Sequence, residues 1–116
     1  FPAFYRRSTG IPVDRRYDSI VELAAAVRLH LSLGLDTGVL VANPIPVADE
    51  MASDLYDVAI RTALADADSR GIRGRAVTPF LLDRLHAVTG GESVRANLAL
   101  LRHNAHVAAA LAVAGV

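Results

Sequence analysis

Apolar residues recur at helical spacing in four stretches of the chain, and residues that favour helix ends bound each stretch. The first stretch follows Ser19, which together with Glu22 has the spacing of a capping box, and Gly34 stops it. Gly71 stops the second stretch, and Gly90-Gly91 stop the third. Thr78 and Pro79 have the types preferred at a helix start. The helices that we expect cover approximately residues 20–33, 49–70, 78–89 and 94–114.

One apolar run, from Gly38 to Ala42, lacks the helical period and ends at a turn rich in proline. Its continuous, β-branched character is typical of a strand buried on both faces between helices. The pattern therefore predicts an α/β fold with three or four helices around one buried strand. A central strand needs neighbours on both sides, and the chain offers none. We therefore expect residues 1–116 to form one segment of a larger domain.

The stretch from Phe1 to Asp18 contains two prolines and a glycine and shows no helical period. It is predicted to be extended or irregular, with a possible edge strand from Gly10 to Val13, where proline is tolerated. Phe1, Phe4 and Tyr5 need an apolar surface to rest on.

Composition removes several classes of function. Twelve basic and twelve acidic residues give a formal net charge of zero, which argues against nucleic-acid binding and against a polybasic membrane-surface protein. No apolar run reaches the roughly 18–20 residues of a membrane span. The absence of cysteine excludes disulfides and thiolate metal sites and is compatible with a cytoplasmic protein. All basic residues are arginine, so no Schiff base through a lysine can form within this chain.

Two asparagines are the most informative polar residues. Asn97 and Asn104 are seven positions apart and project to one side of the otherwise apolar last helix. Buried amides need hydrogen-bond partners, so the pair either is structural or contacts a ligand. His103 and His106 have a permitted metal-ligand spacing, but no carboxylate accompanies them on that turn. We assign no metal ligand to this chain.

Four segments, taken together and in order, resemble one family. They are Phe1-Pro2-Ala3-Phe4-Tyr5 with Arg7-Ser8-Thr9-Gly10; Val41-Ala42-Asn43-Pro44-Ile45-Pro46; Gly71-Ile72-Arg73-Gly74 with Val77-Thr78-Pro79-Phe80-Leu81-Leu82; and Gly90-Gly91-Glu92-Ser93 with Ala96-Asn97-Leu98-Ala99-Leu100 and Asn104-Ala105. They are similar to the C-terminal segments of pseudouridine-5'-phosphate glycosidases, also called the indigoidine synthase A family. His103 departs from the pattern, since the family often has asparagine there.

The resemblance implies a three-layer α/β/α fold and a homotrimer. It also implies a lyase or glycosidase reaction, the reversible C–C cleavage of pseudouridine 5'-phosphate to uracil and ribose 5-phosphate. The family's Schiff-base lysine, its acid–base glutamate and its ligands for Mn²⁺ lie upstream of the matched segments, so we expect the isolated chain to be inactive. Asn97 carries over as the catalytic candidate, and Asn104 and Asn43 as substrate-binding candidates.

Two hypotheses remain open. The chain is either the C-terminal part of such an enzyme or a stand-alone helical oligomerisation or interaction module derived from one. The intact aromatic segment at Phe1, Phe4 and Tyr5 favours the first hypothesis.

Overall fold

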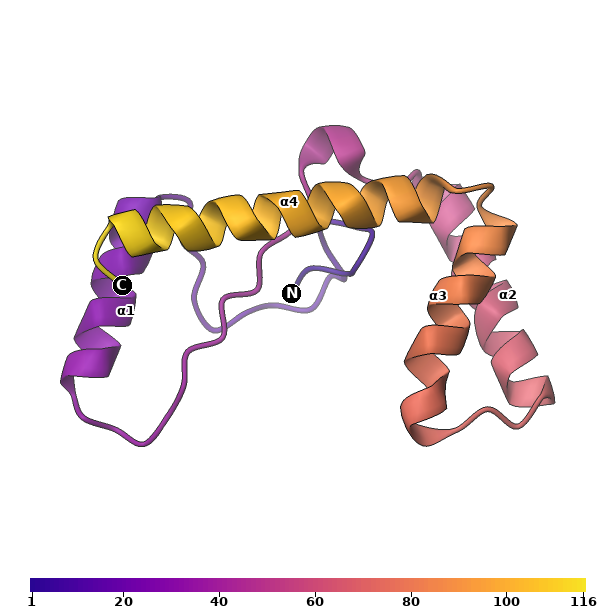
Figure 1. Cartoon of the computed structure of the whole chain (residues 1–116), viewed down its shortest axis with the longest axis horizontal. Coiled ribbons are helices and arrows are strands. Elements are labelled where there is room, and N and C mark those ends of the chain that lie inside the picture. The colour runs from indigo at the N-terminus through magenta and orange to yellow at the C-terminus, as the bar shows by residue number, and fades with distance from the viewer.

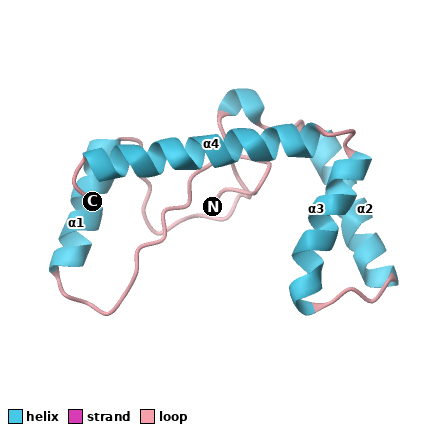
Figure 2. Ribbon diagram, viewed as in Figure 1, coloured by secondary structure: helices cyan, strands magenta, loops and turns pink.

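A computed structural model describes residues 1–116 and contains helices but no β-strand (Figure 2). The α-helices are α1 (Ile20–Ser32), α2 (Ser53–Ser69), α3 (Val77–Val88) and α4 (Glu92–Val113), and the 3-10 helices are η1 (Val47–Asp49) and η2 (Gly74–Ala76). The four predicted helices are therefore all present. The largest error in a helix end is at α2, which was predicted to begin near Asp49 and begins at Ser53.

Helix α4 runs along the length of the molecule and carries the other helices at its two ends (Figure 1). Helix α1 packs against the C-terminal end of α4 and contacts no other helix. Helices α2 and α3 form an antiparallel pair that joins the N-terminal end of α4 (Figure 1). Between these ends, the irregular segments 1–18 and 33–46 run along one side of α4 (Figure 1).

The sharp turn from α3 to α4 has a local chemical cause. The hydroxyl of Thr89 donates to the Leu85 carbonyl at 2.7 Å and accepts from the Ser93 amide at 3.1 Å, so one side chain serves the end of one helix and the start of the next. Gly90 and Gly91 between them have φ of 59° and 95°, a backbone region that favours glycine. The predicted glycine stop is confirmed.

The glycine stops of α1 and α2 are also confirmed, because Gly34 and Gly71 follow these helices with positive φ. Two details of the predicted helix starts are wrong. Ser19 occupies the N-cap position of α1, but its side chain makes no capping hydrogen bond. Thr78 does not cap α3, because η2 leads directly into that helix and places the N-cap at Ala76.

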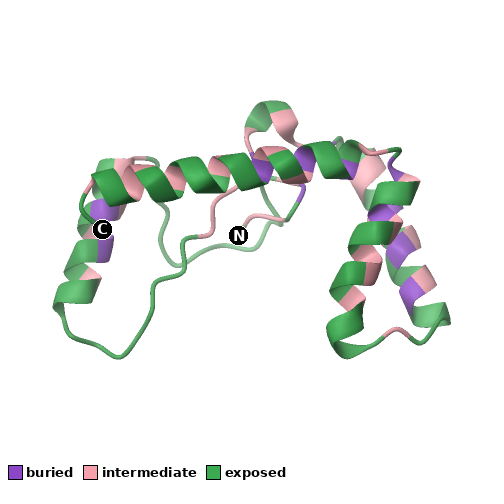
Figure 3. Ribbon diagram, in the orientation of Figure 1, coloured by how far each residue is buried: buried purple, intermediate pink, exposed green.

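A small core joins the N-terminal segment, α2, α3 and the first half of α4 (Figure 3). Its buried members are Tyr5, Ile45, Met51, Ala59, Ala63, Leu85, Ala96 and Leu100. Three of them are alanines, which let helix backbones approach closely. Burial of Tyr5 confirms that the aromatic segment rests on an apolar surface, although Phe1 and Phe4 stay about half exposed.

The predicted strand from Gly38 to Ala42 is wrong: this segment is irregular and open to solvent. Leu40 is 84% exposed, and Val39 and Val41 are 43% and 37% exposed. An apolar run becomes a strand only where neighbouring strands satisfy its backbone groups, and residues 1–116 supply no such neighbour. The possible edge strand from Gly10 to Val13 is absent for the same reason.

The molecule exposes more surface than a compact chain of its size. Its solvent-accessible area is 7869 Å², against about 6,100 Å² for a compact monomer of 12.3 kDa. Its radius of gyration is 16.9 Å, against about 13 Å for a compact domain of this length. Only 13 of 116 residues are buried. Large apolar surfaces on α1, on α4 and on the segment 33–41 are therefore uncovered.

No helix combines the length and the apolar character that crossing a lipid bilayer requires.

We predict that Gly91→Ala lowers the free energy of unfolding by about 1 kcal/mol, because alanine is strained at φ 95°. A methyl group there meets no atom within 4 Å, so the cost comes from the backbone alone. Urea denaturation followed by circular dichroism measures the change. Gly38→Ala is the matched control, since Gly38 has ordinary φ and open space around it. Equal stability of the two variants would contradict the prediction.

Candidate functional site

The fold brings together two of the three asparagines named from the sequence. Asn43 lies on the irregular segment that follows the apolar run, and Asn104 lies on α4, 61 positions later. The side-chain nitrogen of Asn43 donates to the side-chain oxygen of Asn104 at 2.9 Å. Asn43 is half-buried and Asn104 is exposed. The two amides therefore form a polar pair at the surface of α4, where a ligand can reach them.

A hollow of about 310 Å³ opens beside this pair. Its lining consists of the two asparagines and four apolar residues, Val41, Val107, Ala108 and Leu111. No charged side chain contributes to the lining. The volume is at the lower end of the range of about 300–1,000 Å³ found for small-molecule sites. The hollow thus combines apolar walls with one polar pair.

Asn97 stands apart from this hollow. It lies two helical turns before Asn104, or about 10 Å along α4, and it is half-buried. Its side-chain amide makes no hydrogen bond with another residue of the chain, and no buried side-chain nitrogen or oxygen is left unpaired. The amide of Asn97 is consequently accessible and available to a group from outside these 116 residues.

The segment that carries Asn43 is held in place by the N-terminal segment. A guanidinium nitrogen of Arg7 donates to the carbonyl oxygen of Ile45 at 2.6 Å, and the Met51 amide donates to the carbonyl oxygen of Tyr5 at 3.1 Å. Ile45 is completely buried. The position of Asn43 therefore depends on a residue 36 places earlier in the chain, Arg7.

The carboxylate of Glu50 binds both Arg6 and Arg7 of the N-terminal segment. One of its carboxylate oxygens accepts from the Arg7 amide at 2.9 Å and from the Arg6 guanidinium at 2.8 Å. The hydrogen bond from the Arg7 backbone and, after it, that from Arg6 lower the pKa of Glu50 below its ordinary value. Arg6 also donates to the hydroxyl of Ser53 at the start of α2. Glu50 thus joins the N-terminal segment to the residues that lead into α2.

Tyr5, next to Arg6 in the sequence, is buried in the core. Its ring meets Phe4 edge-on with the ring centroids 4.8 Å apart, and it lies 6.4 Å from the ring of Tyr56 on α2. Burial raises the pKa of the Tyr5 phenol, and the neighbouring Ser93 hydroxyl opposes that shift. The phenol remains protonated near neutral pH, so Tyr5 acts here as a packing residue.

Arg6, Arg7 and Glu50 support the site, and the sequence pattern did not predict this role for them. Only one signal was available for them, namely that Arg7 belongs to the Arg7-Ser8-Thr9-Gly10 segment of the family pattern. Periodicity gave no indication that this segment lies against Ile45.

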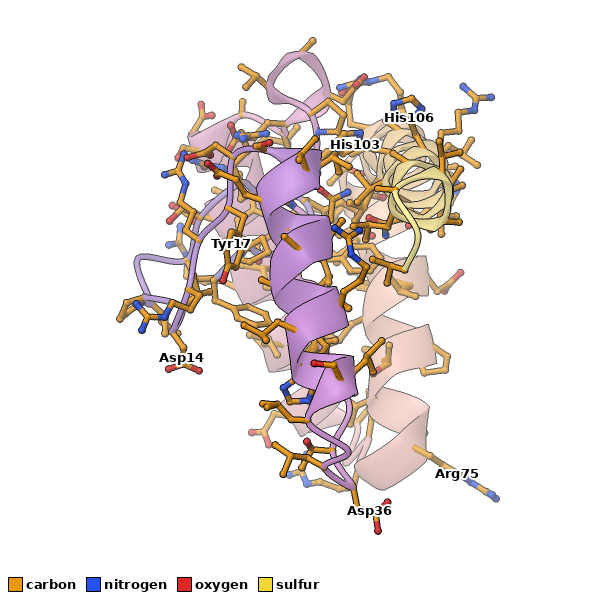
Figure 4. All side chains as sticks on the ribbon, turned by 90° about the vertical axis from the view of Figure 1, so that its left-hand side faces the viewer. Asp14, Tyr17, Asp36, Arg75, His103 and His106 are labelled. Atoms are coloured by element: carbon orange, nitrogen blue, oxygen red, sulfur yellow. The ribbon has the colours of Figure 1, made fainter.

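The histidines of α4 do not form a metal centre with other residues. His103 and His106 lie beside the axis of α4, far from the labelled Asp36 and Arg75 at the opposite edge of the molecule (Figure 4). Residues 1–116 contain no group of three or more histidine, cysteine, aspartate or glutamate side chains that could hold a metal ion.

A second hollow, of about 200 Å³, lies between the aromatic segment, α2 and α3. Its lining is mostly apolar and contains three hydroxyl groups, those of Thr78, Tyr5 and Tyr56, beside Phe4, Ile60, Leu81, Leu82 and Leu85. None of the residues that line it carries a charge.

Almost the whole chain matches one protein family and several curated relatives. The family described as "Indigoidine synthase A like protein" matches residues 1–114. Pseudouridine-5'-phosphate glycosidase 2 of Rhizobium johnstonii is 49% identical over 114 residues, which are 98% of this chain and 37% of the relative. The glycosidase of Cupriavidus pinatubonensis is 48% identical over 98% of this chain and 36% of its own length.

A solved structure is similar in fold. The prealnumycin C-glycosynthase AlnA in complex with ribulose 5-phosphate superposes with a TM-score of 0.78 at 33% sequence identity. The match covers 93% of this chain and 35% of that one. The chain therefore spans only about a third of the length of the proteins it resembles.

We predict that Glu50→Gln lowers the free energy of unfolding by about 1 kcal/mol at pH 7. The expected change is small because the Arg6–Glu50 ion pair is partly exposed, and solvent screens it. The folded-state pKa of Glu50 is depressed, so its contribution is present above the unfolded-state pKa near 4.5. That contribution is lost as the pH falls through the lower folded-state pKa. Urea denaturation of wild type and variant at pH 7 and near pH 3 measures this difference.

Asp18→Asn is the control, because Asp18 forms a highly exposed pair with Arg16 and its removal has little effect at either pH. A Glu50→Gln deficit of the same size at both pH values would show that the carboxylate charge is not what stabilises the contact.

Proposed function

The chain belongs to the family of indigoidine synthase A like proteins, and from this we propose that it supplies the C-terminal part of a pseudouridine-5'-phosphate glycosidase site. The proposed reaction is the reversible cleavage of the C–C glycosidic bond of pseudouridine 5'-phosphate, which gives uracil and ribose 5-phosphate. The observation that carries the proposal is the match of residues 1–114 to this family, with relatives named for this activity at 48–49% identity.

The proposed share of this chain is binding and orientation of substrate. Asn97 offers a donor and an acceptor in fixed geometry, and its amide is accessible with no partner in the chain. We assign it the contact with the sugar or the base at the reacting centre. The bonded pair of Asn43 and Asn104 contributes further substrate contacts beside the apolar hollow.

Covalent chemistry is assigned to residues outside this chain. The 116 residues contain no lysine, so a Schiff base with the opened sugar requires a lysine from elsewhere in the complete site. The chain spans 36–37% of its relatives, which leaves room for that lysine and for an acid–base glutamate in the remaining portion. We propose that the chain is inactive by itself.

The Mn²⁺ implied by the family does not fit the residues present here. No three candidate ligands gather in residues 1–116, and the site lining is apolar apart from two amides. We therefore derive no step of the reaction through a metal bound to this chain.

The open apolar surface favours a second candidate, a helical module that associates with copies of itself. The exposed apolar residues of α1 and α4, among them Leu29, Leu31, Leu98 and Leu101, are each about half exposed or more. A trimer, as the family resemblance implies, buries part of this surface. Light scattering after gel filtration measures the oligomeric state of the chain. A stable oligomer that shows no cleavage of pseudouridine 5'-phosphate, even when combined with the remaining portion of a relative, favours this candidate.

We predict that cleavage of pseudouridine 5'-phosphate, assayed with Mn²⁺, appears only when the chain is combined with the remaining N-terminal portion of the Rhizobium johnstonii relative. Asn97→Ala in that mixture lowers kcat by about 100-fold, the usual effect of removing one positioned hydrogen-bonding group. Arg102→Ala, at an exposed position of the same helix, is the matched control and leaves the rate close to that of wild type.

Cleavage by the chain alone would refute the assignment of the lysine to another portion. Full activity of the Asn97→Ala mixture would remove Asn97 from the site.

A further inference from the structure

We propose that Arg7 is a positioning residue for the reaction, and that it acts on Asn43 through the carbonyl oxygen of Ile45. The inference rests on the proposed function for the reaction in which Asn43 takes part. It assigns to Arg7 no contact with substrate and no share in the chemical step.

The segment that carries Asn43 has no support from its own backbone. No residue from Asn43 to Ile45 takes part in a backbone–backbone hydrogen bond. Pro44 and Pro46 have no amide N–H, so neither can donate to a neighbouring part of the chain. The position of this segment therefore depends on side chains that reach it from elsewhere.

The guanidinium of Arg7 supplies the charged contact to this segment. One of its nitrogens donates to the carbonyl oxygen of Ile45 at 2.6 Å. Ile45 is completely buried, so without this donor its carbonyl oxygen would lack a hydrogen bond in the protein interior. Hydrogen bonds from a charged donor are roughly twice as strong as those between neutral groups. Removal of the Arg7 donor is therefore costly at this point of the chain.

The proline pattern transmits the position of Ile45 to Asn43. Proline fixes its own φ at about −65°, and the residue before a proline is restricted to extended backbone. Asn43 and Ile45 both precede a proline, and Pro46 itself has φ of −56° and ψ of 145°. Residues 43–46 therefore form a stiff extended unit. When the Ile45 carbonyl is held, the side-chain nitrogen of Asn43 is held at 2.9 Å from the oxygen of Asn104.

The two neighbouring arginines have different partners. The side chain of Arg6 binds Glu50 and the hydroxyl of Ser53 at the start of α2. The side chain of Arg7 binds Ile45, while its backbone amide donates to Glu50 at 2.9 Å. Removal of the Arg7 side chain therefore releases Ile45 and leaves the neighbouring ion pair in place.

The positioning is tested by nuclear Overhauser effects between the side-chain amides of Asn43 and Asn104 in the ¹⁵N-labelled 116-residue chain. We expect this effect in the wild type and its loss in Arg7→Met, which keeps an aliphatic stem and removes the donor. Arg7→Lys retains a charged donor, and we expect it to restore the effect. Arg16→Met is the matched control on the same N-terminal segment, because the exposed Arg16 pairs only with Asp18, and it leaves the effect unchanged.

Kinetics separate positioning from a loss of stability. The assay uses the chain combined with the remaining portion of the Rhizobium johnstonii relative. A variant that only folds less well lowers the apparent kcat with the folded fraction and leaves KM unchanged. We expect Arg7→Met to raise KM about tenfold with kcat close to that of wild type, the pattern of a lost binding contact. Arg7→Lys returns KM toward the wild-type value, and Arg16→Met changes neither constant.

One measurement needs no variant and so does not depend on the folding of one. A scalar coupling across the hydrogen bond, from a guanidinium N–H of Arg7 to the carbonyl carbon of Ile45, is expected in the wild-type chain. Its absence in the folded chain would overturn the proposal.

Two results with the variants would also overturn it. If Arg7→Met keeps the contact between the two amides, the guanidinium does not position them. If Arg7→Met lowers kcat at unchanged KM, Arg7 only stabilises the fold. A mixture without any activity refutes the proposed function instead, and the nuclear Overhauser effects then decide by themselves whether Arg7 holds Asn43 against Asn104.

Discussion

The packing of α4 against the irregular N-terminal half is the constraint on which the rest of the structure depends. Ala96 and Ser93 in the first turns of α4 are almost completely buried, and Leu100 follows one turn later. Tyr5 and Ile45 belong to the same core. Because α1 contacts only α4 among the helices, the relative position of the two ends of the molecule is set by this one helix. A change in the packing of α4 against Tyr5 and Ile45 would shift the elements that contact α4, namely α1, α3 and η1.

The candidate site follows from the same packing. The segment around Asn43 has no regular structure, so its position comes from tertiary contacts alone. The buried side chain of Ile45, the Arg7 guanidinium on its carbonyl, and the Glu50 carboxylate provide those contacts. They bring Asn43 within hydrogen-bond distance of Asn104. Secondary structure supplies one half of the site, and an ion-paired irregular segment supplies the other.

The groups at the candidate site limit the chemistry that this chain can perform. Side-chain amides offer hydrogen-bond donors and acceptors, and aliphatic side chains offer apolar surface, but neither forms a Schiff base. The chain contains no lysine, and the apolar faces of α1, α4 and the segment 33–41 are open to solvent. The proposed function assigns both the reactive groups and the cover of these faces to the remaining portion of the enzyme.

The sequence by itself determined the four helices and the glycines that end them, because helix formation depends on contacts between residues three or four positions apart and on local φ. It also identified Asn43, Asn97 and Asn104 as residues of interest, partly through family resemblance. Only the tertiary structure decided that Asn43 bonds to Asn104 and not to Asn97, and that Glu50 holds the connecting segment. It also decided that residues 38–42 remain irregular, since a strand requires hydrogen-bonding neighbours that periodicity cannot supply. Local order follows from neighbouring residues, whereas pairing across 61 positions depends on how the whole chain packs.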